Sequence, residues 1–123
     1  MAPEAKDVRR RFGDRGEDRA AAFFIVRGFR IVARNWSTRM GEIDLICEKD
    51  GVTHFVEVKT RRSTTYGYPE EAITPTKLLH LRRAIECYVQ MSNVRNYQLD
   101  ALAITILPGE PPEFYYVDNI SEE

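Results

Sequence analysis

Two carboxylates, Asp44 and Glu57, and one amine, Lys59, are the strongest candidates in this sequence for a chemically active group of side chains. Between them stands Asp50-Gly51, a pair typical of a two-residue β-hairpin turn. Counting outward from that turn, Asp44 lies directly opposite Glu57 and Glu42 directly opposite Lys59, with facing Cβ atoms about 5 Å apart. The hairpin is therefore expected to carry these charged groups on one face.

The other face of this hairpin is apolar and predicts a core. Its members alternate with the charged residues along both strands: Ile43, Leu45, Cys47, Val56 and Val58. Cys47 faces His54 in the same register. Their place on the apolar side predicts core packing rather than a thiol–imidazole catalytic pair.

Facing like charges are destabilising unless a proton, a cationic side chain or a metal compensates for them. Magnesium is commonly bound by one or two carboxylates together with substrate phosphate oxygens. One interpretation is therefore a metal site formed by Asp44 and Glu57, with Lys59 beside it. The other is an ordinary half-exposed sheet in which Lys59 and Glu42 form a surface ion pair worth ~0.5 kcal/mol. Spacing alone leaves both open.

The elements that would position this hairpin follow from periodicity and end residues. Asp14 and Glu17 have capping-box spacing and predict a helix that runs to about Arg27, followed by Gly28 as its C-cap glycine. Residues 1–12 are expected to be a frayed arm. Thr74-Pro75 opens a second helix after a loop. Strands are expected over residues 29–36, 42–48, 53–60, 97–107 and 114–117.

The order of these elements is helix, three strands, helix, two strands. A strand–helix–strand unit over residues 53–107 implies a right-handed crossover between two parallel strands. The predicted fold class is therefore α/β, a small mixed sheet flanked by helices. With 123 residues, the chain is expected to form a single domain over 1–123.

Composition excludes several classes of protein. Apolar residues make up 43% and charged residues 30% of the chain, which is typical of a folded, soluble domain. The longest apolar run, 20–26, is too short to span a bilayer and lies behind mixed charges, unlike a signal peptide. A cytoplasmic location without membrane association is expected. Two cysteines and two histidines fit neither a disulfide framework nor a standard zinc spacing.

Charge is distributed unevenly along the chain, although the net charge is only −1. Residues 1–40 hold ten basic and five acidic side chains, whereas residues 100–123 hold six acidic side chains and no basic one. A basic end and an acidic end can indicate contact with nucleic acid. A solvated surface explains the same distribution, and charge alone favours that explanation.

The spacing of Asp44 and Glu57-Val58-Lys59 around a hairpin is similar to the D…ExK core of the PD-(D/E)XK nuclease superfamily. Longer blocks resemble the YraN-like family of uncharacterised, endonuclease-like bacterial proteins. These blocks are Gly16-Glu17, Asn35-Trp36, residues 41–46 and residues 55–61, and Gly67 and Lys77 also fit. The resemblance covers roughly residues 12–103.

This resemblance implies a restriction-endonuclease-like αβββαβ core, Mg²⁺ (or Mn²⁺) as cofactor, and nucleic acid as the partner, with DNA favoured over RNA. The family is similar to archaeal Holliday-junction resolvases, which add a helical glutamate to the core. Glu17 matches that glutamate, and the analogy allows a homodimer. One departure is Gln98-Leu99-Asp100, where relatives tend to read Arg-Phe-Asp, and Asp100 is kept as an additional candidate.

The implied activity is hydrolysis of phosphodiester bonds in branched or single-stranded DNA during repair or recombination. Asp44, Glu57 and Glu17 would bind the metal, and Lys59 would orient the attacking water. Nucleic-acid contacts are expected from Arg61, Arg62 and Lys77: the two arginines directly follow the motif, and Lys77 would meet a phosphate at a helix N-terminus. A non-catalytic nucleic-acid-binding module and a plain interaction protein are the alternatives.

Overall fold

The computed structural model describes residues 8–63 and 73–120, with side chains described from Gly16 onward. The expected loop around Gly67 and the first seven residues of the expected arm lie outside this range. The elements, in chain order, are α1 (Val8–Val26), β1 (Arg30–Ser37), β2 (Glu42–Lys49), β3 (Val52–Arg61), α2 (Pro75–Met91), β4 (Tyr97–Thr105) and β5 (Glu113–Val117). The predicted mixed α/β class is confirmed.

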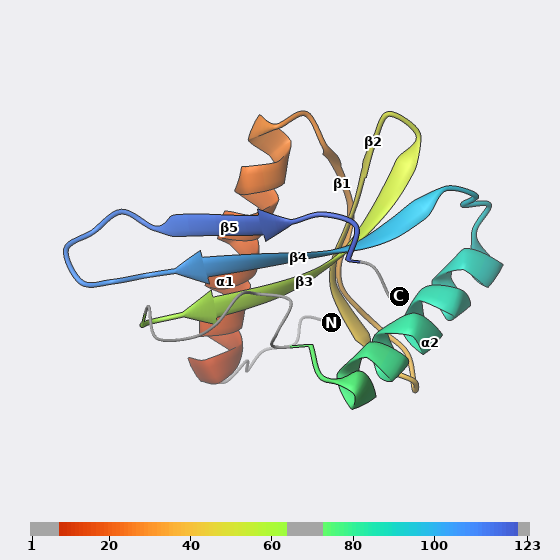
Figure 1. Cartoon of the computed structure of the whole chain (residues 1–123), viewed down its shortest axis with the longest axis horizontal. Helices are drawn as coiled ribbons and strands as arrows, with labels where there is room; N and C mark the ends of the chain where they lie inside the picture. The colour runs from red at the N-terminus through yellow and green to blue at the C-terminus, as the bar shows by residue number, and fades with distance from the viewer. Residues whose placement is uncertain (1–7, 64–72, 121–123) are drawn as a thin grey trace, which may run out of the picture.

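The five strands form one open sheet in the order β1-β2-β3-β4-β5 (Figure 1). Only β3 and β4 pair in parallel, as expected from the crossover through α2, and the other pairs are antiparallel. No helix in the described residues is long and apolar enough to cross a membrane.

The two helices cover opposite faces of the sheet. On one face, Phe23 and Phe24 of α1 pack against Val56 and Leu102. On the other, residues of α2 pack against Phe55, which precedes Val56 and therefore points the opposite way. The expectation of a single apolar face is therefore wrong, because the crossover helix needs a core of its own.

The hairpin between β2 and β3 has the predicted turn. Asp50 and Gly51 both have positive φ, 54° and 80°, as a type I′ turn requires. The expected register is observed from Lys49↔Val52 to Leu45↔Val56.

The pairing stops there, one pair short of the predicted Asp44–Glu57 pair, and the predicted Glu42–Lys59 pair lies beyond the recorded pairing. The alternation of β2 also breaks at this point. Ile43 belongs to the α2-side core, whereas Leu45, two residues later, belongs to the α1-side core. Ile43 was expected beside Leu45. The end of the β2–β3 pairing frees the backbone around Asp44 to turn.

Helix α1 begins at Val8, earlier than the capping-box spacing predicted. Asp14 is therefore inside the helix and is not its N-cap, and residues 8–12 belong to the helix rather than to a frayed arm. Glu17 lies in the middle of α1 and therefore does not cap the helix. The predicted C-terminus is close, since Gly28 has φ 92° and its N–H donates to the carbonyl of Ile25.

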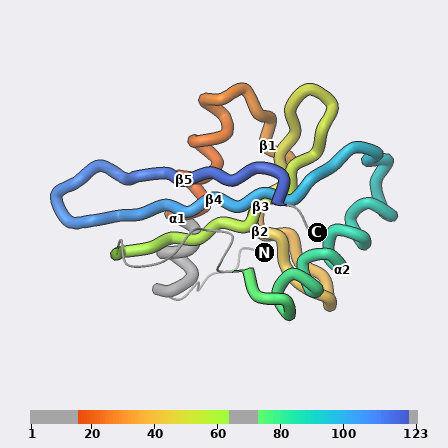
Figure 2. Tube along the Cα trace, in the orientation of Figure 1, coloured from red at the N-terminus to blue at the C-terminus, as the bar shows by residue number. Residues whose placement is uncertain are grey.

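Helix α2 begins as predicted. Thr74 is its N-cap and accepts a hydrogen bond from the backbone N–H of Lys77, and Pro75 occupies the first turn. The helix lies close to the β1–β2 connection (Figure 2). A Cβ atom on Gly41 would stand 2.9 Å from the carbonyl oxygen of His80, so a glycine is needed for this approach.

Asp100 is fully buried in β4 and organises one end of the sheet. Its carboxylate lies 2.6 Å from Nδ1 of His54 and accepts hydrogen bonds from the hydroxyl of Tyr116, the amide of Gln98 and the backbone N–H of Asn119. Four partners account for both carboxylate oxygens, so Asp100 is a structural residue here. Gln98 supplies one of these contacts.

Candidate active site

A cleft of about 430 Å³ lies between the N-terminal end of α2 and the point where β2 and β3 separate. Both predicted carboxylates of the hairpin line it. The lining residues are Gly41, Glu42, Asp44, Glu57, Thr74, Thr76, Lys77, His80 and Leu81. The cleft therefore collects residues from the hairpin and from a helix about 20 residues further along the chain.

Asp44 occupies the place where the β2–β3 ladder ends. Its Oδ2 accepts a hydrogen bond of 2.8 Å from the backbone N–H of Val58, next to Glu57. A side-chain carboxylate thus satisfies a β3 donor beyond the last recorded pair with β2. This hydrogen bond holds Asp44 beside Glu57 without the direct strand pairing that was predicted.

Glu57 is 7% exposed and forms an ion pair through Oε2 with Nζ of Lys77. A carboxylate this buried needs a partner, because burial without one costs several kcal/mol. Lys77 comes from the first turn of α2, where the helix macrodipole favours anions. Glu57 therefore meets both an ammonium group and the positive end of a helix.

The pKa of Asp44 is raised from 3.8 to about 8. Burial is the main cause, followed by repulsion from Glu57, and Glu17 raises it further. The Val58 N–H and Lys77 act in the opposite direction. Two further carboxylates, Glu57 and Glu17, thus act on Asp44, and the positive charge of Lys77 does not fully compensate for them.

Glu17 reaches this cluster from α1. Its side chain is half-buried, its Oε1 atom is buried, and it acts electrostatically on Asp44. The close approach of α1 to β3 helps, because a Cβ atom on Gly16 would stand 2.5 Å from Oγ1 of Thr60. The charge of the helical glutamate suggested by the resemblance therefore acts on the hairpin carboxylate Asp44.

Lys59 projects to the same side of β3 as Glu57, because the two residues are two positions apart in the strand. Its side chain is exposed, and no contact within the described residues joins it to Asp44 or Glu57. The ammonium group recorded at the carboxylates belongs to Lys77, which was expected to meet a nucleic-acid phosphate. The pKa of Lys77 is lowered by burial, but the hydrogen bond to Glu57 and the charges of Glu57 and Asp44 outweigh this and raise it.

The two arginines after the motif differ in exposure. Arg61 is 9% exposed at the end of β3, and its carbonyl accepts a hydrogen bond from the N–H of Ile106. Arg62 is exposed. Of the two, Arg62 presents its side chain to solvent.

Sequence reasoning missed the contribution of the α2 N-terminus to the cleft. Thr74, Thr76 and His80 line it. One pattern could have revealed this. Lys77 and His80 are three residues apart and therefore share one face of α2.

Carboxylate oxygens are the donors that Mg²⁺ and Mn²⁺ prefer. Oδ2 of Asp44 and Oε2 of Glu57 are engaged, whereas Oδ1 and Oε1 have no hydrogen-bond partner in the described part of the chain. No group of three or more His, Cys, Asp or Glu side chains is arranged as a metal cage within residues 16–63 and 73–120. Two carboxylates fit a magnesium-type site that is completed by water and substrate, and they do not fit a closed zinc site.

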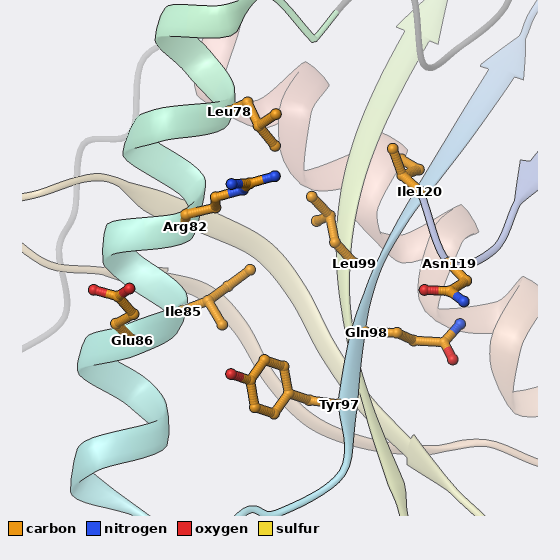
Figure 3. A pocket seen from close by; sticks show the side chains of 9 residues that line it. All are labelled: Leu78, Arg82, Ile85, Glu86, Tyr97, Gln98, Leu99, Asn119 and Ile120. Carbon is orange, nitrogen blue, oxygen red and sulfur yellow. The ribbon is translucent and has the colours of Figure 1, made fainter. Parts of the chain in front are cut away.

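A second pocket, of about 280 Å³, lies on the other flank of α2 (Figure 3). Arg82 and Ile85 face it from the helix, and Tyr97 and Leu99 face it from β4, while Glu86 points away. Its lining shares no residue with the carboxylate cleft.

The buried thiol of Cys47 lies opposite His54 in the β2–β3 register. Burial and the charge of Asp100 raise the pKa of this thiol to about 12, and this excludes a thiolate nucleophile near neutral pH.

Fold and site define a small mixed α/β protein with an acidic cleft at the end of a β-hairpin. The model of the uncharacterised protein family UPF0102 matches residues 16–104, and the chain belongs to that family. It is 49% identical over 83 residues to a UPF0102 protein of Syntrophomonas wolfei, covering 68% of this chain and 72% of the relative. It is 40% identical over 109 residues to a UPF0102 protein of Neisseria meningitidis, covering 89% and 93%. The YraN-like resemblance is thereby confirmed as family membership.

Proposed function

We propose that this protein is a metal-dependent endonuclease of the PD-(D/E)XK type that hydrolyses phosphodiester bonds in DNA. One observation carries the proposal. Asp44 and Glu57, from the two strands of one hairpin, lie together in one cleft, and the charge of Glu17 on α1 acts on Asp44. Such a cluster of acidic side chains costs stability and is typical of sites that bind a cation and phosphate.

The chemistry would be divided among the residues of the cleft. A divalent cation at Asp44 and Glu57, when bound, supplies charge to the scissile phosphate and lowers the pKa of a nearby water molecule. The Asp44 carboxylate is oriented by the backbone N–H of Val58, which is a fixed donor. Glu17 can accept a hydrogen bond from the attacking water. The ammonium group of Lys77, on the first turn of α2, would stabilise the charge that develops on the phosphate oxygens.

The nucleic-acid strand would lie over the N-terminal turn of α2. Helix N-termini favour phosphate groups, and Thr74 and Thr76 add hydroxyl groups to the cleft. Arg62 is exposed beyond the end of β3 and is the arginine best placed to contact a neighbouring phosphate. The similarity to Holliday-junction resolvases favours DNA over RNA and branched or single-stranded substrates, and a homodimer would match such substrates.

A non-catalytic nucleic-acid-binding module is the second candidate. The observation that favours it is the ion pair between Lys77 and Glu57, which engages one of the two carboxylates. In such a module the acidic cluster would be a remnant of a nuclease site. DNA binding would then persist without cleavage.

A cleavage panel tests the proposal. Branched, flap, single-stranded and duplex DNA would each be incubated with Mg²⁺ or Mn²⁺ and with wild type, Asp44→Asn or Glu57→Gln. Cleavage of at least one substrate by wild type, lost by 100-fold or more in both variants, is the expected result. Salt-dependent DNA binding without cleavage would support the second candidate, and neither binding nor cleavage would overturn both.

Glu110→Gln is the matched control for the panel. Glu110 is an exposed carboxylate in the connection between β4 and β5 and lines none of the described pockets. Its removal changes the net charge by the same amount as Glu57→Gln. Activity that falls equally in both variants would point to a general charge effect rather than to the cleft.

A further inference from the structure

The single ammonium group recorded at the acidic cluster belongs, within the described residues, to Lys77 rather than to the motif lysine, Lys59. Nζ of Lys77 is paired with Oε2 of Glu57, and its charge also acts on Asp44. Lys77 is held at the base of α2 by the Thr74 cap, so its backbone is fixed while its four-carbon side chain can swing. A fixed backbone and a mobile charge suit a group that alternates between two partners.

We propose that Lys77 is the resident counter-ion of the acidic cluster, which pairs with Glu57 while the site lacks metal and leaves it when a divalent cation binds. This inference rests on the proposed function, because it concerns the same carboxylates. It assigns to Lys77 a positioning role that the D…ExK pattern does not contain. Lys59 has no such contact within residues 16–63 and 73–120 and takes no part in the exchange.

Charge and burial explain why a resident cation is needed. Glu57 is 7% exposed, and an unpaired carboxylate at this buried position would strongly destabilise the folded state through its desolvation. The side chain of Lys77 is 45% exposed, so it can return to solvent at little cost. The exchange is therefore asymmetric: the buried carboxylate stays in place and the exposed amine moves.

The same geometry explains why Lys77 must leave. An ammonium group on Oε2 of Glu57 and a divalent cation on the same carboxylate would repel each other at short range. Free of Glu57, the amine remains on the first turn of α2, in the cleft where a phosphate would sit. Lys77 would then contact a phosphate oxygen, which agrees with its predicted nucleic-acid role.

Metal binding without substrate tests the exchange. Mn²⁺ would be titrated calorimetrically into wild type, Lys77→Met and Lys59→Met, and bound Mn²⁺ would be counted by electron paramagnetic resonance. Removal of a competing cation should tighten Mn²⁺ binding by about fivefold in Lys77→Met, as expected for a half-exposed ion pair. Lys59→Met removes the same charge two residues from Glu57 and should bind Mn²⁺ as wild type does.

A second measurement uses the wild-type protein, so that it does not depend on how a variant folds. The rate at which an amine-acylating reagent modifies Lys77 would be followed by mass spectrometry with and without Mg²⁺. Addition of Mg²⁺ should release Lys77 from Glu57 and raise its acylation rate severalfold relative to that of Lys49. Lys49 serves as the internal reference because it lies at the far end of the hairpin, where its amine donates to the carbonyl of Arg27.

The outcomes separate this inference from the proposed function. If wild type binds Mn²⁺ and Lys77→Met binds it equally or more weakly, the exchange is wrong while the nuclease proposal stands. An unchanged acylation rate in saturating Mg²⁺ overturns the exchange as well. If wild type binds neither metal at millimolar concentration, the proposed function fails and this inference fails with it.

Discussion

Without metal, the Asp44→Asn variant should be more stable than wild type, and the difference in the free energy of unfolding should grow as the pH rises. Asn keeps an acceptor for the Val58 N–H but carries no charge next to Glu57. In wild type the pKa of Asp44 is about 8 in the folded state and 3.8 when unperturbed, so the folded protein binds a proton that the unfolded chain releases. Stability from this group is complete below the unfolded pKa and is lost as the pH rises toward the folded pKa.

The size of the effect follows from that interval. Between pH 5 and pH 7 the unfolded Asp44 is ionised and the folded one is mostly protonated, so wild type loses about 1.4 kcal/mol of stability per pH unit from this group. Two pH units give at most about 2.7 kcal/mol. Repulsion shared with Glu57 and Glu17 makes this an upper limit. Asp44→Asn should lack this slope.

Urea denaturation in a chelating buffer at pH 5, 6 and 7 would measure the slope. Asp118→Asn, an exposed carboxylate change, should run parallel to wild type. Addition of Mn²⁺ at pH 7 should stabilise wild type and leave Asp44→Asn nearly unchanged, because a ligand that binds only the folded state raises its stability. Parallel pH profiles for wild type and Asp44→Asn, or a less stable Asp44→Asn at pH 7, would refute this reasoning.

Three further substitutions test the surrounding structure by urea denaturation. Gly41→Ala should cost about 1–3 kcal/mol, because its Cβ would meet the backbone carbonyl of His80 at 2.9 Å; unchanged stability would show that α2 can move away. Tyr116→Phe should cost about 2 kcal/mol, since it removes a hydroxyl that donates to the buried Asp100 carboxylate, and a neutral result would contradict the structural role of Asp100. Thr74→Ala should cost about 1 kcal/mol through the lost N-cap, with Thr74→Ser restoring most of it.

The local features of the fold could be predicted from the sequence because short-range chemistry decides them. Asp50-Gly51 specifies a turn that needs positive φ, Gly28 ends α1, and Thr74-Pro75 begins α2. The parallel pairing of β3 and β4 followed from the length of the connection between them. Each of these features depends on neighbouring residues or on chain handedness, and none of them requires knowledge of distant contacts.

The start of α1 was predicted wrongly because a local capping pattern was taken as the beginning of the helix. The capping-box spacing of Asp14 and Glu17 is a local pattern, yet the helix continues back to Val8. A capping box is one of several ways to satisfy the first turn, and the preceding residues include few helix breakers. The longer helix changed the interpretation of Glu17 from a capping residue to a member of the acidic cluster.

Turn chemistry and a two-residue period place Asp44 and Glu57 in one hairpin, because both act within a few residues of the turn. The folded arrangement sets where that register ends, brings Asp44 to the Val58 N–H, and pairs Glu57 with Lys77 rather than Lys59. Those outcomes depend on how α2 packs across the sheet. Contacts between residues 20 apart in the chain follow from packing of the whole domain, and no local pattern encodes them.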